Sequence, residues 1–263
     1  FGNNYGIINS KISKKKSVNT ILKKANEENI NYIDTAFNYE NSELCIGKYL
    51  ANKNINLKII TKFSKQEKDL REQYQISNHR LNIKPWAILL HTCKDYLNHN
   101  LRKELFKLKK EKLTTKVGVS LYSLGEIKKI LTVEKPDIIQ FPINILDQRI
   151  YKSGILQILK EKKIEIHARS VFLKGLLYLE KNIITKKFNK LSKPLVTLSE
   201  ISRLLNINLS QLSLLWVNHI KEIDKIIIGV DSKSQISENL EILTYKFEKK
   251  YVDQILKISF KDD

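Results

Sequence analysis

The chain has 263 residues, of which 42% are hydrophobic and 29% charged, so it can bury a core and is not a disordered tail. Lysine and arginine number 47 against 28 acidic residues, a formal net charge of +19. The basic residues are 41 lysines and only 6 arginines, scattered along the chain. Because proteins that read nucleic acids depend on the planar fork of arginine, we expect no nucleic-acid partner.

The two cysteines, Cys45 and Cys93, stand in no paired or metal-binding spacing. This favours a reducing compartment and predicts neither a disulfide nor a metal site. No apolar run reaches the ~18 residues of a transmembrane helix, and the first residues lack the layout of a signal peptide. We therefore expect a soluble cytoplasmic protein with no membrane partner.

Seven short apolar runs rich in β-branched residues recur, each followed by a polar stretch with helical periodicity. This alternation indicates βα units and a parallel sheet. The predicted strands are residues 31–36, 57–63, 86–91, 116–121, 137–141, 164–171 and 225–230. The predicted helices are residues 17–28, 42–52, 66–82, 98–112, 123–133, 151–163, 196–220, 234–243 and 247–259. The stretch 173–194 exceeds an ordinary connection and is either a surface insert or, as we favour, a lid.

A helix is predicted before the first of these strands, so a further strand would precede it. We therefore predict an α/β fold, a single TIM-like (β/α)8 barrel domain over 1–263, with its first strand missing or truncated. A doubly wound sheet is disfavoured because no strand is followed by GxGxxG. The chain contains no Met, even at position 1, so we expect it to be processed or an N-terminal fragment.

Three consecutive predicted strands carry a polar residue at or near their carboxyl ends, namely Asp34, Lys62 and His91. Tyr39 follows in the loop after the first of them. Barrel active sites lie at these strand ends, and a phenol becomes a better acid when an ammonium such as that of Lys62 favours its phenolate. Asp34 would keep Lys62 charged, and a neutral His91 would orient a substrate oxygen. The set suits proton transfer to a carbonyl oxygen.

These residues resemble the Asp/Tyr/Lys/His arrangement of the aldo/keto reductases. The resemblance rests on DTAFNYENSE (34–43), IITK ending at Lys62, ILLH ending at His91, GVS (118–120), QFPIN (140–144) with DQR (147–149), and IGVDS (228–232) with Glu238-Asn239. It covers nearly the whole chain, from Phe1-Gly2 to the helix near 243. It implies NAD(P)H-dependent reduction of an aldehyde or ketone with Tyr39 as general acid.

The resemblance also implies a nicotinamide cofactor, NADPH or NADH, with NADP(H) favoured. The residues it assigns to that cofactor are Ser120, Gln140, Ser170, Gly229, Ser232, Lys233, Gln235, Glu238 and Asn239. Ser120 and Gln140 would hold the nicotinamide amide. Gln235 stands where the family usually has a cation for the 2′-phosphate, and Lys233 could substitute as a point charge. Independently, Ser232 and Gln235 form a capping-box pattern at a helix end that suits an anion.

Several alternatives stay open at this point. The FGNNYGI opening and the HARSVFLKGLL segment resemble a bacterial branch of the family associated with surface carbohydrates, which implies a sugar-derived small-molecule substrate. The chain would otherwise be a catalytically silent nucleotide-binding or partner subunit with the same barrel. Arg169 would either pair with a carboxylate structurally or bind an acidic substrate or phosphate, whereas His167 is interpreted as structural. The sequence assigns no oligomeric state.

Overall fold

The computed structural model describes residues 15–51, 53, 55–65, 69–179 and 181–258. Its strands are β1 (Tyr32–Asp34), β2 (Lys58–Phe63), β3 (Ala87–Leu90), β4 (Lys116–Ser120), β5 (Ile138–Pro142), β6 (Glu165–Arg169) and β7 (Lys225–Ile226). Its α-helices are α1 (Lys15–Glu27), α2 (Ser42–Leu50), α3 (Leu70–Leu81), α4 (Cys93–Leu97), α5 (His99–Lys110), α6 (Leu124–Ile130), α7 (Arg149–Lys152), α8 (Ile155–Glu161), α9 (Lys181–Lys187), α10 (Ser192–Leu205), α11 (Leu209–His219), α12 (Lys233–Ile242) and α13 (Lys249–Leu256). Two 3₁₀ helices are η1 (Leu173–Tyr178) and η2 (Asn189–Leu191).

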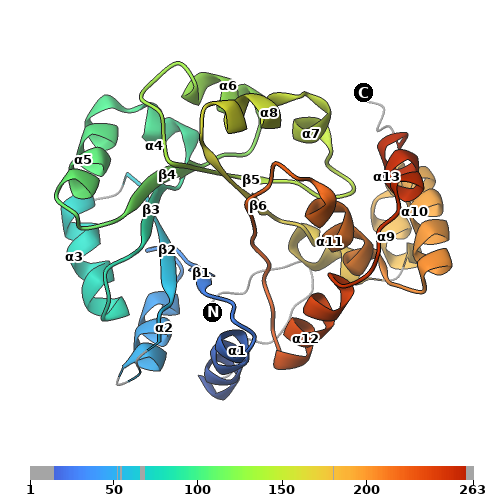
Figure 1. The fold of residues 1–263 in the computed structure, drawn as a ribbon, viewed down its shortest axis with the longest axis horizontal. Coiled ribbons are helices and arrows are strands. Elements are labelled where there is room, and N and C mark those ends of the chain that lie inside the picture. Colours follow the sequence, from blue (N-terminus) through green and yellow to red (C-terminus); the bar gives the residue numbers. More distant parts are fainter. Residues whose placement is uncertain (1–14, 52, 54, 66–68, 180, 259–263) are drawn as a thin grey trace.

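Each strand pairs in parallel with the next one along the chain, in the order β1-β2-β3-β4-β5-β6-β7. Figure 1 shows this curled sheet at the centre with the helices outside it. The arrangement confirms the predicted TIM-like (β/α)8 architecture: six of the seven strands lie within predicted apolar runs, and β5 extends one residue beyond its predicted run, to Pro142. The predicted additional strand would precede α1, and both residues 1–14 and the FGNNYGI opening lie outside the described residues.

The core follows from strands that are covered on both faces. β3 is buried at every residue, as expected for a parallel strand between a barrel interior and a layer of helices. Leu105 and Leu108 of α5 and Ile127 and Ile130 of α6 are fully buried against it and its neighbours. The apolar periodicity of each helix therefore decides which face lies on the sheet.

The predicted helix boundaries are wrong where a single residue adopts a left-handed backbone. Predicted helix 196–220 is two helices, because Asn206 has φ 54° and Asn208 caps α11 in a capping box with Gln211. Predicted helix 151–163 is likewise broken at Gly154, whose φ is 73°. The sequence also missed α4, although Thr92 accepts the amide of Asp95 in a typical N-cap.

The segment 173–194 is not an irregular loop, because it contains η1, α9, η2 and the start of α10. η1 packs against α11, and two residues inside it, Lys174 and Gly175, have positive φ values of 55° and 91°. Whether this segment closes over a ligand stays a prediction.

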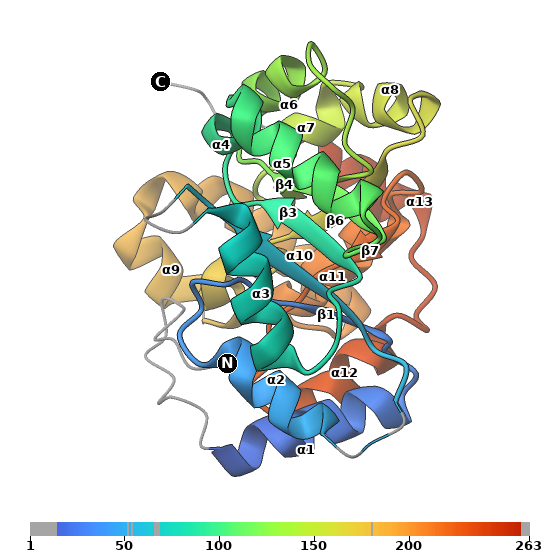
Figure 2. The same cartoon turned by 90° about the vertical axis from the view of Figure 1, so that its left-hand side faces the viewer.

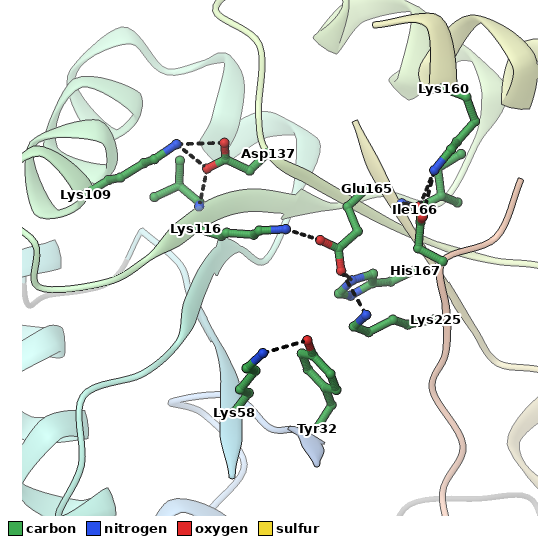
Figure 3. Close-up of polar contacts among 12 residues, drawn as sticks. Tyr32, Lys58, Lys109, Lys116, Asp137, Lys160, Glu165, Ile166, His167 and Lys225 are labelled. Atoms are coloured by element: carbon green, nitrogen blue, oxygen red, sulfur yellow. Dashed lines mark hydrogen bonds and ion pairs between the residues drawn. The ribbon is translucent and has the colours of Figure 1, made fainter. Parts of the chain in front are cut away.

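Charged side chains gather at the amino ends of the strands (Figure 3). Glu165 accepts hydrogen bonds from Lys116 and from His167 Nε2 (2.8 Å), and Lys225 lies 3.3 Å away. Burial raises the pKa of Glu165, but the hydrogen bonds from His167 and Lys116 outweigh it, so the net pKa lies below its usual value. The carboxylate therefore stays ionised and ties β4, β6 and β7 together.

Gly47 lies where α2 packs closely against α3. A Cβ atom there would lie 1.9 Å from the Arg80 carbonyl oxygen, which is backbone and cannot move aside. We expect Gly47→Ala to lower the free energy of unfolding by at least about 2 kcal/mol in urea titrations. The matched control is Gly125→Ala in α6, where the nearest atom is 3.9 Å away, so it should stabilise by up to about 1 kcal/mol. Equal stability of the two variants would contradict this packing.

Candidate active site

Polar side chains stand at the carboxyl ends of six consecutive strands. Asp34 ends β1, Lys62 lies next to the end of β2, and His91 directly follows β3. Ser120 ends β4 and is paired in register with Gln140 of β5, and β6 ends at Arg169. The strands are parallel and adjacent, so these side chains lie on one rim of the barrel, where barrel enzymes carry their active sites.

The loop after β1 is fixed by backbone hydrogen bonds that continue the strand pairing. Thr35 donates to the Ile60 carbonyl oxygen (2.8 Å) and Phe37 donates to that of Lys62 (3.0 Å). The chain then turns, and the Tyr39 amide donates to the Ala36 carbonyl oxygen (3.0 Å). This turn places the half-buried Tyr39 side chain next to the ends of β2 and β3.

Lys62 and Asp34 form a buried ion pair at the centre of the rim. The Lys62 ammonium donates to Asp34 Oδ2 and to the Thr35 carbonyl oxygen (2.9 Å), and the Lys62 side chain is 2% exposed. Burial lowers the pKa of Lys62, while the charge and hydrogen bond of Asp34 raise it and oppose that shift. Gln140 Nε2 donates to the other oxygen of Asp34 at 2.9 Å. Both carboxylate oxygens thus have partners.

The Tyr39 ring lies between this ion pair and His91. Lys62 Nζ is 5.5 Å from the ring centroid, and the His91 ring meets Tyr39 edge-on, with centroids 5.9 Å apart and planes at 71°. Burial, followed by the Lys62 charge, lowers the pKa of His91 from 6.5 to about 4. The imidazole is therefore neutral at physiological pH. The four predicted catalytic residues thus form one cluster.

A second buried carboxylate, Glu43, supports the loop and was missed as a site component. It is 1% exposed and accepts hydrogen bonds from Thr61 Oγ1 and Ser77 Oγ, both at 2.7 Å, and from Arg80 at 3.4 Å. The spacing of Glu43 to Ile46, Gly47 and Leu50 places it on the buried face of α2. A carboxylate at helical spacing with apolar residues was the signal that could have found it.

The residues predicted to hold the nicotinamide lie beside the catalytic cluster. Gln140 is fully buried, and its Oε1 has no hydrogen-bond partner, although its Nε2 is bound to Asp34. Ser120 is also buried next to it. Ser170 follows β6 with a φ of 57° and its Oγ accepts from Arg169 at 3.2 Å. An unsatisfied buried acceptor next to a serine hydroxyl fits a carboxamide ligand.

The remaining predicted cofactor residues lie in the loop after β7 and on α12. Ser232 Oγ caps α12 by accepting the Gln235 amide (3.3 Å). The Gln235 side chain accepts instead from the Asp231 amide (2.7 Å), so the predicted capping box is only half formed. Asn239 is buried and its Nδ2 has no hydrogen-bond partner. Gly229, Lys233 and Glu238 are exposed, and a Cβ at Gly229 would meet nothing within 4 Å.

The start of α12 borders a basic groove. α1 and α12 lie side by side (Figures 1 and 2), and Ile21 and Ala25 of α1 pack against Ile236 of α12. The groove between them is lined by Thr20, Lys23, Lys24, Glu27, Lys233, Ser234 and Ser237. The structure thus places the groove residues on α1 and α12, whereas the four predicted catalytic residues lie at the ends of β1, β2 and β3 and in the loop after β1. Among the described residues, no cluster suits a metal ion and no helix is long and apolar enough to cross a bilayer.

The sequence model of the aldo/keto reductase family matches residues 2–259. No curated protein matches the chain significantly. An aldo-keto reductase of Bacillus halodurans in its holo form superposes with a TM-score of 0.75 at 20% identity, covering 93% of this chain and 88% of that one. The glycerol dehydrogenase of Gluconobacter oxydans gives 0.72 at 22%, covering 91% and 84%. An aldo/keto reductase of Klebsiella pneumoniae in complex with NADP and acetate gives 0.72 at 16%, covering 92% and 84%.

The His91 environment predicts an unusual titration. We expect NMR of the wild-type imidazole to give a pKa near 4, and we expect Lys62→Met to raise it, because that change removes the nearby positive charge. As the pH is lowered, His91 in the unfolded chain therefore binds a proton at a higher pH than His91 in the folded protein. This difference lowers the free energy of unfolding as the pH falls from 6.5 toward 4. A wild-type midpoint at or above 6.5 would refute the assignment.

Proposed function

The chain belongs to the aldo/keto reductase family, and on this premise we propose that it is an NAD(P)H-dependent reductase of aldehydes or ketones with Tyr39 as general acid. The observation that carries the proposal is the buried Lys62–Asp34 ion pair beneath Tyr39 and His91. A pure binding module needs no paired ammonium next to a phenol. Proton transfer from a phenol to a developing alkoxide, in contrast, is helped by such a charge next to the phenol.

The proton transfer follows from the charges of these groups. Asp34 holds the Lys62 ammonium in place, and the Lys62 charge favours loss of the Tyr39 phenolic proton to the substrate oxygen. The neutral His91 imidazole donates a hydrogen bond to the same oxygen and polarises the carbonyl without competing as an acid. A bound nicotinamide cofactor would supply the hydride to the carbonyl carbon.

The cofactor assignment is supported by two buried groups that lack partners. Gln140 Oε1 is a free acceptor next to Ser120 and Asp34, so it would accept from a nicotinamide carboxamide. Asn239 Nδ2 is buried on α12 and meets no acceptor at full hydrogen-bond geometry among the described residues, although the Asn239 side chain also interacts with the Tyr178 hydroxyl, and it would donate to an adenine nitrogen.

NADP(H) is the proposed nucleotide. Lys233 lies at the start of α12 and lines the groove beside it, whereas Lys23 and Lys24 in the same groove are paired with Glu27 and Glu28. Ammonium groups next to a helix N-terminus favour a phosphate. The sugar-derived substrate remains a proposal that rests on the sequence resemblance alone.

Tyr39→Phe tests the general acid. Removing the hydroxyl should reduce kcat for aldehyde reduction by about 10²–10⁴-fold and leave the Kd for NADPH unchanged, because the ring remains. The control is Tyr245→Phe, since Tyr245 is exposed on the loop after α12, and it should keep full activity. A wild-type protein that binds NADPH tightly but reduces nothing in a broad panel of aldehydes, ketones and sugars would instead favour the silent-subunit alternative.

Gln235→Arg tests the nucleotide preference. A guanidinium at this position would add a charge-assisted contact to a 2′-phosphate, so we expect NADPH binding to tighten by about 10-fold or more while NADH binding stays the same. Fluorescence titration measures both. Gln157→Arg, on the exposed face of the distant helix α8, adds the same charge and should change neither. Equal tightening by both variants would show only a general charge effect.

A further inference from the structure

The mouth of the site holds a cation that the proposed proton transfer does not use. Arg169 ends β6 and pairs in register with Pro142 of β5. Its Nη2 donates to the Leu121 carbonyl oxygen (3.0 Å) and its Nη1 to Ser170 Oγ (3.2 Å). Its guanidinium lies 4.2 Å from the centroid of the Tyr122 ring. The side chain is therefore held in place by three neighbours.

The charge of Arg169 is not balanced by a carboxylate. Within the part of the chain that the structure describes, Arg169 takes part in no ion pair. The other two basic groups of the site differ from it, since Lys62 is neutralised by Asp34 and His91 is uncharged at neutral pH. The cluster thus carries one uncompensated positive charge, and that charge is on Arg169.

The position of this charge is close to the reacting groups. Arg169 is among the groups that lower the pKa values of both Lys62 and His91. An uncompensated cation next to a lysine on which catalysis depends is unfavourable. A bound anion would offset that cost. A ligand with a negative charge would therefore explain why this guanidinium lies next to Lys62 without a carboxylate partner.

The geometry leaves the guanidinium able to bind. A guanidinium has more N–H donors than its contacts to Leu121 and Ser170 use. The Tyr122 ring lies against the guanidinium and is itself 56% exposed, so it holds the group without closing it off. The Leu121 anchor is rigid, because Leu121 is buried and its amide donates to the Gln140 carbonyl oxygen (2.7 Å). Such a fixed planar fork suits a carboxylate or phosphate.

We propose that Arg169 is a specificity-determining residue that binds an anionic group of the substrate, so that the substrate class is a carbonyl compound bearing a carboxylate or phosphate. The inference rests on the proposed reductase function, because it places the substrate carbonyl at Tyr39 and His91. The Leu121 and Ser170 contacts hold the guanidinium at the rim, and the remaining donors bind the anion. The diphosphate of the cofactor is the competing source of the same chemistry.

The first experiment compares succinic semialdehyde with its methyl ester, which lacks the negative charge. With NADPH as reductant, the wild type should favour the acid by about 10- to 100-fold in kcat/KM. Arg169→Met should bring this ratio close to one, and Arg169→Lys should keep part of the preference. The ratio should not change across the neutral and mildly alkaline range, because a guanidinium does not titrate there.

The second measurement is binding, which needs no turnover. Butyrate should bind the NADP-saturated wild type more tightly than butyramide in calorimetry, and Arg169→Met should abolish the difference while the Kd for NADP stays unchanged. Equal binding of the two ligands by the wild type would overturn the proposal, as would weaker NADP binding in Arg169→Met. If neither aldehyde is reduced, the reductase function fails, and the butyrate comparison still decides the anion site.

Discussion

The site depends on one buried charge, the ammonium of Lys62. A lysine that is almost completely buried is stable only when it is paired, and removing one partner of such a pair costs about 3–5 kcal/mol. Asp34 supplies the partner, and the Thr35 carbonyl oxygen supplies a second acceptor. The pair then influences its surroundings, because the Lys62 charge lies next to Tyr39 and adds to burial, the larger cause, in keeping His91 neutral.

The second oxygen of Asp34 links this pair to the cofactor residues. The Gln140 side-chain N–H donates a hydrogen bond to Asp34, which leaves the amide oxygen without a hydrogen-bond partner among the described residues. The orientation of an acceptor proposed to hold the cofactor is therefore set by the same carboxylate that holds the catalytic lysine. The proposed proton transfer and the proposed cofactor placement would therefore share one hydrogen-bond network through Asp34, and a change at Asp34 would affect both.

The two ends of the barrel differ in how their charged side chains are paired. At the amino ends of the strands, Glu165 is surrounded by Lys116, Lys225 and His167, so that the cations have a carboxylate partner (Figure 3). At the carboxyl ends, Lys62 is paired with Asp34, whereas Arg169 forms no ion pair with any residue that the structure describes. Balanced charge stabilises the amino ends of the strands, whereas the uncompensated charge at the carboxyl ends is available to a ligand. This contrast is why we read Arg169 as a recognition group and the Glu165 cluster as structural.

Local pattern was sufficient for the strands and for the polar residues that meet at their carboxyl ends. The seven apolar runs predicted the sheet, and polar residues at the ends of three of them predicted the Asp34, Lys62 and His91 cluster, because parallel strands bring their carboxyl ends together. The helix breaks at Gly154 and Asn206 were not predicted, because a single left-handed residue ends a helix without disturbing the spacing of the apolar residues around it.

The contacts between distant segments were determined only by the tertiary structure. The bond between Gln140 and Asp34 joins residues 106 positions apart, and the Arg169 contact to Leu121 spans 48. Residue types alone left Arg169 open between a structural pair and an anion site, because whether a charge is compensated depends on which segments pack around it. The sequence by itself therefore determined the barrel and the residues at its rim, while packing determined which of their charges and polar atoms remain free to bind.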